Sequence, residues 1–133
     1  MRFDLPTPDL EQQPYWDAAR EGRLLIRHCG ACGAHHFYPR PFCPWCWSVD
    51  VSWVEASGRA TLYTYSVVHA NDLPPFPERV PYVAAIVELA EGPRMMTNVE
   101  ECALDALEAG MPLEVAFRAI SDEVTIPVFR PAP

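Results

Sequence analysis

Two cysteine pairs constrain the fold of this chain more than any other feature of the sequence. Two residues lie between Cys29 and Cys32, Cys43 and Cys46 repeat that spacing, and ten residues lie between the inner cysteines. Each spacing lets one tight turn direct two sulfurs at a single ion, and four thiolates complete the tetrahedron that zinc prefers. The alternative, two independent pairs of buried cysteines, is disfavoured by this spacing. The sequence therefore predicts one zinc ion per chain, bound by Cys29, Cys32, Cys43 and Cys46.

A site closed by four cysteines assigns the zinc a structural role, because no coordination position is left for water. Iron in the same ligands would resemble rubredoxin, so electron transfer through bound iron is an alternative, but the short separation of the pairs favours a zinc ribbon. Gly33, after the first pair, permits the positive φ that such turns often use. We expect His28, His35 and His36 to be exposed or capping residues rather than ligands.

Length and composition limit the remaining choices. The chain has 133 residues, of which 50% are hydrophobic, enough to bury the core of one domain with a small module attached. It has no uninterrupted apolar run of about 18 residues and no signal-peptide pattern, so we expect neither a membrane span nor secretion. Paired cysteines that serve as metal ligands are typical of a reducing compartment, which favours the cytoplasm.

The charge balance argues against a polyanionic partner. The formal net charge is -8, and a zinc ion with four thiolates would bring it to about -10. Binding to nucleic acid draws much of its free energy from cations at phosphates, so this charge opposes it. All ten cations are arginine, which excludes a lysine Schiff base.

Three segments follow from the changes in pattern along the chain: an N-terminal tail and helix (1–22), a zinc ribbon (23–50) and a barrel (51–133). The helix is expected between Asp9 and Gly22, with Pro14 in its first turn and glycine at its end. A short strand from Leu24 to Ile26 leads into the first cysteine pair.

The segment from residue 51 onward reads as strands rich in Val, Thr, Tyr and Ile. A helical spacing interrupts the strands at Cys102–Ala109, before Gly110. Three barrel strands, a short helix and two strands match the connectivity of a five-stranded OB-type barrel, so the fold class is mainly β. The strands are predicted at Val51–Val54, Arg59–His69, Tyr82–Leu89, Arg94–Thr97, Leu113–Ala119 and Thr125–Phe129.

A proline-dense stretch from His69 to Pro81 is predicted to be a loop between the first two barrel strands. OB-folds often build a ligand or partner surface from a loop in this place. The alternative is a stiff connector with Phe76 tucked against the barrel.

The sequence carries no recognised catalytic motif: no nucleophile elbow, no zinc-protease helix, no P-loop and no dinucleotide fingerprint. His69 and Asp72 are three residues apart, but such a pair in a polar loop usually makes a turn contact. We therefore predict no catalytic residue.

Several short motifs in a fixed order resemble one known family. They are Pro14-Tyr15-Trp16, Glu21-Gly22-Arg23-Leu24, the cysteine pairs with Tyr38-Pro39-Arg40, Ser57-Gly58-Arg59, Pro81-Tyr82, Val87-Glu88-Leu89 with Glu91-Gly92, and Gly110-Met111. From Pro14 to Phe129 the chain resembles the acyl-CoA-associated family of zinc ribbon plus OB-fold known as domain of unknown function thirty-five.

The resemblance implies an N-terminal helix, a rubredoxin-like ribbon and an OB barrel that act beside a thiolase-superfamily enzyme. Members of the family look like noncatalytic subunits: the partner, a thiolase, an acyltransferase or a sterol side-chain aldolase, makes or breaks a carbon-carbon bond in an acyl-CoA. The small protein then supports assembly with the partner or helps to hold or channel its substrate.

Large aromatic residues gather in and before the ribbon, and a module of about twenty residues cannot bury all of them. Because aromatic residues are enriched in interface cores, we expect a partner-binding surface, although packing within the chain is the alternative. The candidates are Tyr15, Trp16, Phe37, Tyr38, Trp45 and Trp47.

Arginine side chains are the candidates for binding the phosphates of acyl-CoA on this acidic chain. Arg59 and Arg79 form one candidate pair, because sheet order could bring both to the barrel rim. Arg23 and Arg40, which the family motifs contain, form the ribbon-side alternative.

The leading hypothesis is thus an accessory subunit without catalytic residues. The alternative is a nucleic-acid-binding module, since ribbons and OB barrels both occur in that role and Tyr63 and Tyr65 could stack on bases.

Overall fold

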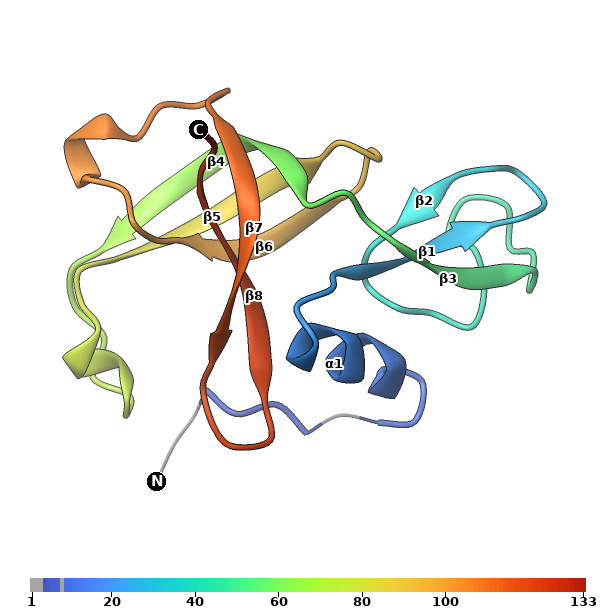
Figure 1. Ribbon diagram of the computed structural model, residues 1–133, viewed down its shortest axis with the longest axis horizontal. Helices are drawn as coiled ribbons and strands as arrows, with labels where there is room; N and C mark the ends of the chain where they lie inside the picture. Colours follow the sequence, from blue (N-terminus) through green and yellow to red (C-terminus); the bar gives the residue numbers. More distant parts are fainter. Residues whose placement is uncertain (1–3, 8) are drawn as a thin grey trace.

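One helix and two sheets make up the part of the chain that the computed structural model describes, residues 4–7 and 9–133 (Figure 1). The helix α1 (Gln13–Arg20) is shorter than the predicted span, and residues 1–3 and 8 of the predicted N-terminal segment lie outside the described residues. A three-stranded sheet and a closed five-stranded barrel follow. The predicted fold class, mainly β with a helix, a ribbon and a five-stranded barrel, is confirmed. Among the described residues, no helix is long and apolar enough to cross a membrane.

The three-stranded sheet frames the cysteine site. It contains β1 (Leu25–Cys29), β2 (His35–His36) and β3 (Val51–Glu55) in the order β2-β1-β3, with both neighbours antiparallel to β1. The predicted barrel segment, 51–133, therefore begins with a strand that pairs with the ribbon instead. Leu25 lies opposite Glu55 and Cys29 opposite Val51. The residue pattern predicted that β3 is a strand but not that it pairs with β1, because a half-buried strand can pair with the ribbon sheet or with the barrel.

The barrel closes in the order β4-β5-β6-β8-β7. Burial alternates along β5, as expected where one strand face meets a core and the other meets solvent. The parallel pair β6 and β8 meets at Val99 and Phe129. The strands are β4 (Arg59–Val68), β5 (Tyr82–Leu89), β6 (Arg94–Val99), β7 (Pro112–Ala119) and β8 (Thr125–Pro131).

The helix predicted at Cys102–Ala109 does not form. A single 3-10 turn, η2 (Leu104–Ala106), stands in its place between extended residues Ala103 and Leu107. Leu107 is the one fully buried side chain of this segment. With only Leu107 buried, a short helix here would have too little packing to offset its nucleation cost, so the prediction was wrong. Cys102, at the start of this segment, is partly exposed.

The ribbon and the barrel share one hydrophobic core. Tyr15 of α1, Ile26 of β1 and Phe37 belong to the same cluster as Leu62 and Phe129 of the barrel. The helix α1 contacts β7 and β8, and Figure 1 shows it between the ribbon and the lower β7–β8 hairpin. Both parts are therefore held in a fixed relation by apolar packing.

Gly58 marks the passage from β3 into the barrel. Its φ is +85°, and a Cβ there would lie 2.7 Å from Cγ1 of Val115 on β7. The Val115 amide also donates to the Gly58 carbonyl at 2.8 Å. Only glycine combines this backbone conformation with so close an approach.

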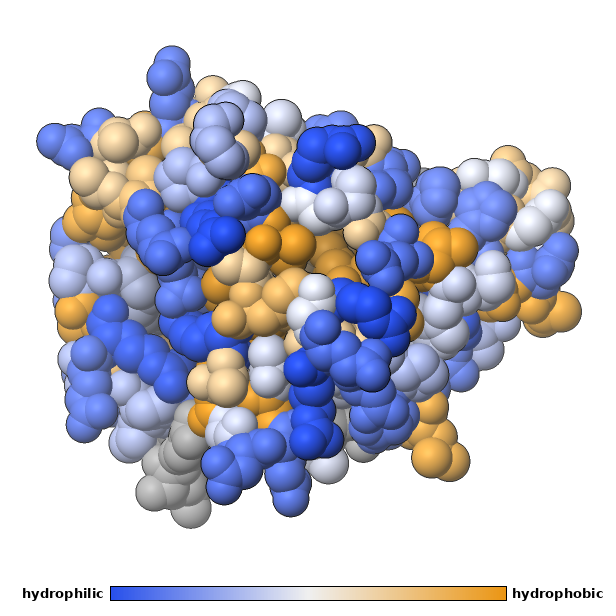
Figure 2. Space-filling model, viewed as in Figure 1, coloured by the Kyte–Doolittle hydropathy of each residue, from blue (hydrophilic) through white to orange (hydrophobic). Residues whose placement is uncertain are grey.

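The outer surface over β7 and β8 is mixed in character. Figure 2 shows apolar residues near the centre of this face, with hydrophilic residues around them. A shallow hollow there is lined by Ala116, Phe117 and Val128, with Arg118 and Arg130 at its edge. Both arginines are paired with glutamates, so neither of them is an unpaired cation on this face.

Candidate metal centre

The four cysteine sulfurs converge at one end of the ribbon. Cys29 and Cys32 come from the end of β1 and the turn after it, and all four sulfurs lie within 4.8 Å of one another. Sγ of Cys29 is 3.6 Å from Sγ of Cys46, and Sγ of Cys32 is 3.7 Å from Sγ of Cys43. A zinc–sulfur bond of about 2.3 Å gives a tetrahedron with edges of about 3.8 Å, so the donors fit zinc. The predicted ligand set is brought together, and one zinc ion is the cofactor that it fits.

Two equivalent turns present the sulfurs. In the first, the Gly33 amide donates to the Cys29 carbonyl at 2.9 Å, and in the second the Trp47 amide donates to the Cys43 carbonyl at 2.9 Å. The Cys32 amide is also 3.4 Å from the Cys29 sulfur. Donation from backbone amides stabilises thiolates, and the Cys32 amide is the main cause that lowers the pKa of the Cys29 thiol to about 7.

The six predicted partner-binding aromatics separate into two groups. Tyr15 and Phe37 are buried in the core, and their rings meet edge to face at 5.6 Å, with Trp16 packed partly buried beside Tyr15. Packing within the chain, the alternative that the sequence left open, accounts for these three residues. Tyr38, Trp45 and Trp47 are instead exposed.

Trp45 and Trp47 belong to the second cysteine turn, and Tyr38 lies in the segment between β2 and that turn. Trp45 is 70% exposed and Trp47 is 73% exposed. Trp47 stacks on Phe42 with ring centroids 5.3 Å apart and an interplanar angle of 13°. The Trp45 amide donates to the Cys43 sulfur at 3.4 Å. Two tryptophans left in water on a metal-ordered turn form a surface suited to protein contact.

The barrel-rim pair of arginines is not brought together. Ala60, beside Arg59, pairs with Leu89, whereas Val68 at the other end of β4 pairs with Tyr82, three residues after Arg79. The two arginines thus lie at opposite ends of a ten-residue strand, roughly 30 Å apart along it. Sequence order alone could not reveal this, because the hairpin register was unknown.

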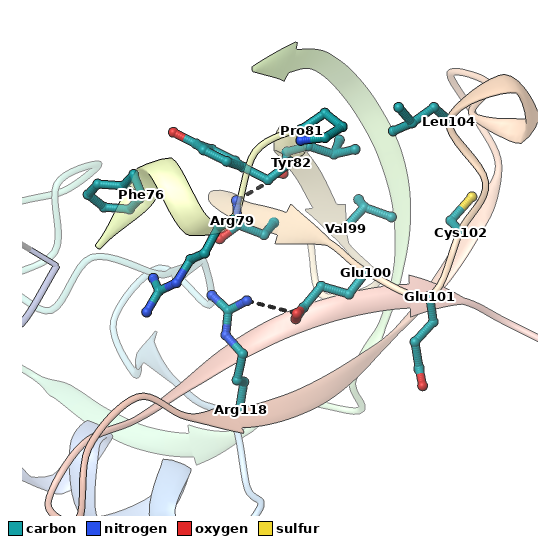
Figure 3. A pocket seen from close by; sticks show the side chains of 12 residues that line it. Phe76, Arg79, Pro81, Tyr82, Val99, Glu100, Glu101, Cys102, Leu104 and Arg118 are labelled. Carbon is teal, nitrogen blue, oxygen red and sulfur yellow. Dashed lines mark hydrogen bonds and ion pairs between the residues drawn. The ribbon is translucent and has the colours of Figure 1, made fainter. Parts of the chain in front are cut away.

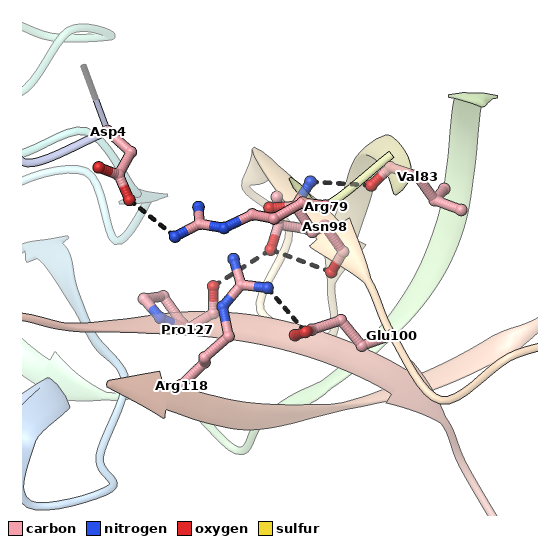
Figure 4. Close-up of polar contacts among 8 residues, drawn as sticks. Asp4, Arg79, Val83, Asn98, Glu100, Arg118 and Pro127 are labelled. Carbon is pink, nitrogen blue, oxygen red and sulfur yellow. Dashed lines mark hydrogen bonds and ion pairs between the residues drawn. The ribbon is translucent and has the colours of Figure 1, made fainter. Parts of the chain in front are cut away.

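Arg79 lies at a cavity of about 380 Å³ between the proline loop and the segment after β6 (Figure 3). Its guanidinium donates to the Asp4 carboxylate at 3.0 Å and lies over the Phe76 ring, while Arg118 pairs with Glu100 at 2.8 Å (Figure 4). Both cations are therefore neutralised by carboxylates. The proline loop thus borders a cavity, and Phe76 also packs near Tyr82, so both readings of the loop, a ligand or partner surface and a stiff connector, stay open.

The ribbon-side arginines also lie in different surroundings. Arg23 pairs with Glu21 and lies 3.6 Å from Glu55. Arg40 instead lines a hollow of about 190 Å³ where the ribbon meets the barrel. Tyr38 and Trp45 line the same hollow.

Sequence reasoning missed two residues of this hollow, His36 and Arg94. Arg94 begins β6, more than fifty positions after Arg40, so no local sequence pattern connects it with the ribbon. His36 was expected to be exposed or capping, but it is 6% exposed and neither ring nitrogen has a hydrogen-bond partner in the described structure.

Tyr63 and Tyr65, the candidates for base stacking, are both engaged. The Arg94 guanidinium lies 3.9 Å from the Tyr63 ring centroid, and the Tyr65 hydroxyl donates to the Leu107 carbonyl at 3.3 Å.

Family comparisons agree with this architecture in both parts. Residues 16–52 match the family described as "ChsH2, rubredoxin-like zinc ribbon domain", and residues 53–118 match "ChsH2, C-terminal OB-fold domain". A solved structure titled "Ltp2-ChsH2(DUF35) aldolase" has a TM-score of 0.87 and 40% identity, covering 97% of this chain and 100% of that one. A DUF35 structure from Sulfolobus solfataricus, with a TM-score of 0.64 and 12% identity, shows the same fold.

Two relatives bear names that differ in kind. A "Probable enoyl-CoA hydratase alpha subunit" of Thermomonospora curvata is 42% identical over 96% of this chain, which spans 40% of that protein. A "DUF35 domain-containing scaffold protein" of Methanocaldococcus jannaschii is 36% identical over 81% of this chain and 77% of the relative. With a zinc ribbon and an OB barrel matched in order and four sulfurs placed for one zinc ion, the chain belongs to the ChsH2 (DUF35) family.

Proposed function

We propose that this chain is a noncatalytic accessory subunit that assembles with a thiolase-superfamily enzyme and helps to hold or channel the acyl-CoA substrate of that enzyme. The observation that carries the proposal is the exposure of Trp45 and Trp47 on the second cysteine turn. Large aromatic side chains on a rigid, metal-ordered turn dominate binding energy when a partner buries them. Folding of the chain does not bury Trp45 and Trp47, whereas assembly with another protein would bury them.

The names of the relatives support the proposal from a second direction. The solved structure with 40% identity is titled as an aldolase of two components, and three archaeal relatives, among them the one from Methanocaldococcus jannaschii, are named scaffold proteins. Hydratase alpha subunits also occur among the relatives, as the protein from Thermomonospora curvata shows by its name. The partner reaction is therefore the finer part of the proposal, and carbon-carbon bond cleavage or formation by a thiolase-fold partner is the form that we favour.

Several features of the chain suit an accessory role. The zinc ligands are four cysteines, and a closed set of four leaves no position for a reacting water. Of the four proposed CoA-phosphate ligands, Arg23 and Arg79 are paired with carboxylates, whereas Arg40 and Arg59 form no ion pair with any residue that the structure describes. A reducing compartment such as the cytoplasm keeps the cysteines as thiolates, and we place the protein there.

The proposal is tested by reconstituting activity from separate components. A candidate thiolase-superfamily partner is assayed for acyl-CoA cleavage or condensation, first alone and then with the zinc-loaded chain. The zinc-loaded chain is also assayed by itself. We expect turnover from the pair and none from the isolated chain. Turnover of acyl-CoA by the isolated chain would end the accessory-subunit proposal.

A further inference from the structure

The hollow between the ribbon and the barrel is built from both parts of the molecule. Its ribbon wall includes Tyr38, Pro44 and Trp45, and its barrel wall consists of Pro93 and Arg94. The Met96 amide donates to the Tyr38 hydroxyl at 3.2 Å, which ties the ribbon to strand β6 beside the hollow. The Trp45 amide contacts the sulfur of a zinc ligand. The walls are thus set by the metal site and by the barrel together.

The residues that line this hollow carry positive charge and no negative charge. The lining residues include Arg40 and Arg94 and contain no aspartate or glutamate. Arg40 is exposed and forms no ion pair with any residue in the ranges 4–7 and 9–133. Arg94 lies 3.6 Å from Glu88, and both side chains are about half exposed, so water weakens this pair. On a chain of net charge -8, two such arginines at one hollow form a local anion site.

The floor of the hollow is polar and carries no negative charge. His36 is 6% exposed, and both ring nitrogens lack a hydrogen-bond partner in the described structure. Burial, followed by the charges of Arg27 and Arg40, lowers the pKa of His36, which keeps the imidazole neutral near pH 7. Arg27, opposite His36 on β1, pairs with Glu11 and donates to the Arg40 carbonyl at 3.4 Å. Glu11 is thus held by Arg27 and does not line the hollow.

The size of the hollow selects the kind of occupant. Its volume is about 190 Å³, whereas pockets for drug-sized ligands and cofactors occupy about 300–1,000 Å³. One side chain with an oxyanion at its end fits such a space. Arginines aligned beside exposed aromatic residues are typical of the centre of a protein interface, where guanidinium groups bind carboxylates with two hydrogen bonds.

We propose that this hollow receives the carboxylate of an aspartate or glutamate from the partner protein, held by Arg40 and Arg94 between the side chains of Tyr38 and Trp45. The inference rests on the proposed function, because it names the chemistry by which the partner is recognised. It adds that recognition uses the junction of the ribbon with the barrel and not the exposed tryptophans alone. The carboxylate supplies the counter-charge that Arg40 lacks among the described residues and strengthens the weak pairing of Arg94.

The test measures, by isothermal titration calorimetry, the affinity of the zinc-loaded chain for its candidate thiolase-superfamily partner. Arg40→Gln, Arg94→Gln and the double variant are compared with Arg20→Gln, which removes an exposed arginine of α1 away from the hollow. Zinc content and circular dichroism confirm that each variant is folded. We expect each hollow variant to weaken binding at least tenfold, since loss of one partner of a buried charge pair typically costs more than that. Arg20→Gln should bind within about twofold of wild type.

A second arm identifies the carboxylate. Each acidic residue on the partner surface is replaced by its amide, and a double-mutant cycle is measured against Arg40→Gln. One acidic residue should couple to Arg40, so that the second substitution has little further effect. Wild-type affinity in Arg40→Gln and Arg94→Gln, or the absence of any acidic partner residue that couples to Arg40, overturns this inference while the proposed function stands. Failure of the wild-type chain to bind the thiolase-fold protein overturns both.

Discussion

Gly33 and Trp47 occupy equivalent positions in the two cysteine turns, each four residues after the first cysteine of its pair. Both have left-handed backbone conformations, with φ of +80° at Gly33 and +68° at Trp47. Glycine adopts this conformation without steric cost, but a bulky side chain adopts it at about 1–2 kcal/mol. The second turn therefore holds a strained tryptophan where the first has the residue that the geometry favours, and strain of this kind points to function.

Trp47→Gly is expected to separate stability from binding. Relief of backbone strain offsets the lost stack on Phe42, which is worth about 0.5–1.5 kcal/mol, so the free energy of unfolding should change by less than about 1 kcal/mol. Affinity for the thiolase-fold partner should fall at least tenfold, because an exposed interface tryptophan is lost. Trp47→Ala, which keeps the strain and loses the ring, should be less stable than Trp47→Gly by about 1 kcal/mol. Equal stability of the two variants in urea titrations would argue against strain.

Cys43→Ser should abolish stoichiometric zinc. A neutral hydroxyl cannot replace a thiolate in a closed tetrahedral site, and the metal-binding free energy contributes to folding of the ribbon. Native mass spectrometry measures zinc per chain, and Cys102→Ser is the matched control because Cys102 lies outside the sulfur cluster. One zinc ion retained by Cys43→Ser would show that the ligand assignment is wrong.

Gly58→Ala should destabilise the barrel at the point where the ribbon sheet leads into it. The added methyl group would lie 2.7 Å from Cγ1 of Val115, at a backbone φ of +85°. Steric overlap and the left-handed conformation together should cost about 2–4 kcal/mol of unfolding free energy. Chemical denaturation of the variant checks this value. Gly22→Ala is the control, because its φ is +79° but no atom lies within 4 Å of the added methyl group.

His36 should make the chain less stable in mildly acidic solution. Burial, with Arg27 and Arg40, lowers the pKa of His36 in the folded chain, while the unfolded chain keeps a pKa of about 6.5. As pH falls below about 6.5 the unfolded state gains the proton first, so folding stability decreases until the folded value is passed. Urea titrations at pH 7.5 and 5.5 should show a smaller loss for His36→Gln than for wild type. A loss of equal size in both would mean that His36 does not contribute.

The sequence predicted those features that local spacing determines. Two cysteine pairs identify the metal ligands, and Gly33 was expected to have the positive φ that it shows. Long-range pairing was not readable in the same way, which is why β3 was grouped with the barrel and why Arg59 and Arg79 were placed on one rim. Arg94 joins the ribbon hollow through tertiary packing alone. The segment 102–109 shows that helical spacing without buried neighbours does not make a helix.

The central claim, assembly with a thiolase-superfamily enzyme through the zinc-ordered surface, is tested most directly by sedimentation velocity of the two purified proteins. We expect the zinc-loaded chain and its candidate thiolase-superfamily partner to sediment as one complex at micromolar concentration, and the Cys43→Ser variant to sediment separately from that partner. If the two proteins sediment separately even at concentrations about one hundred times a micromolar Kd, the proposed assembly is contradicted.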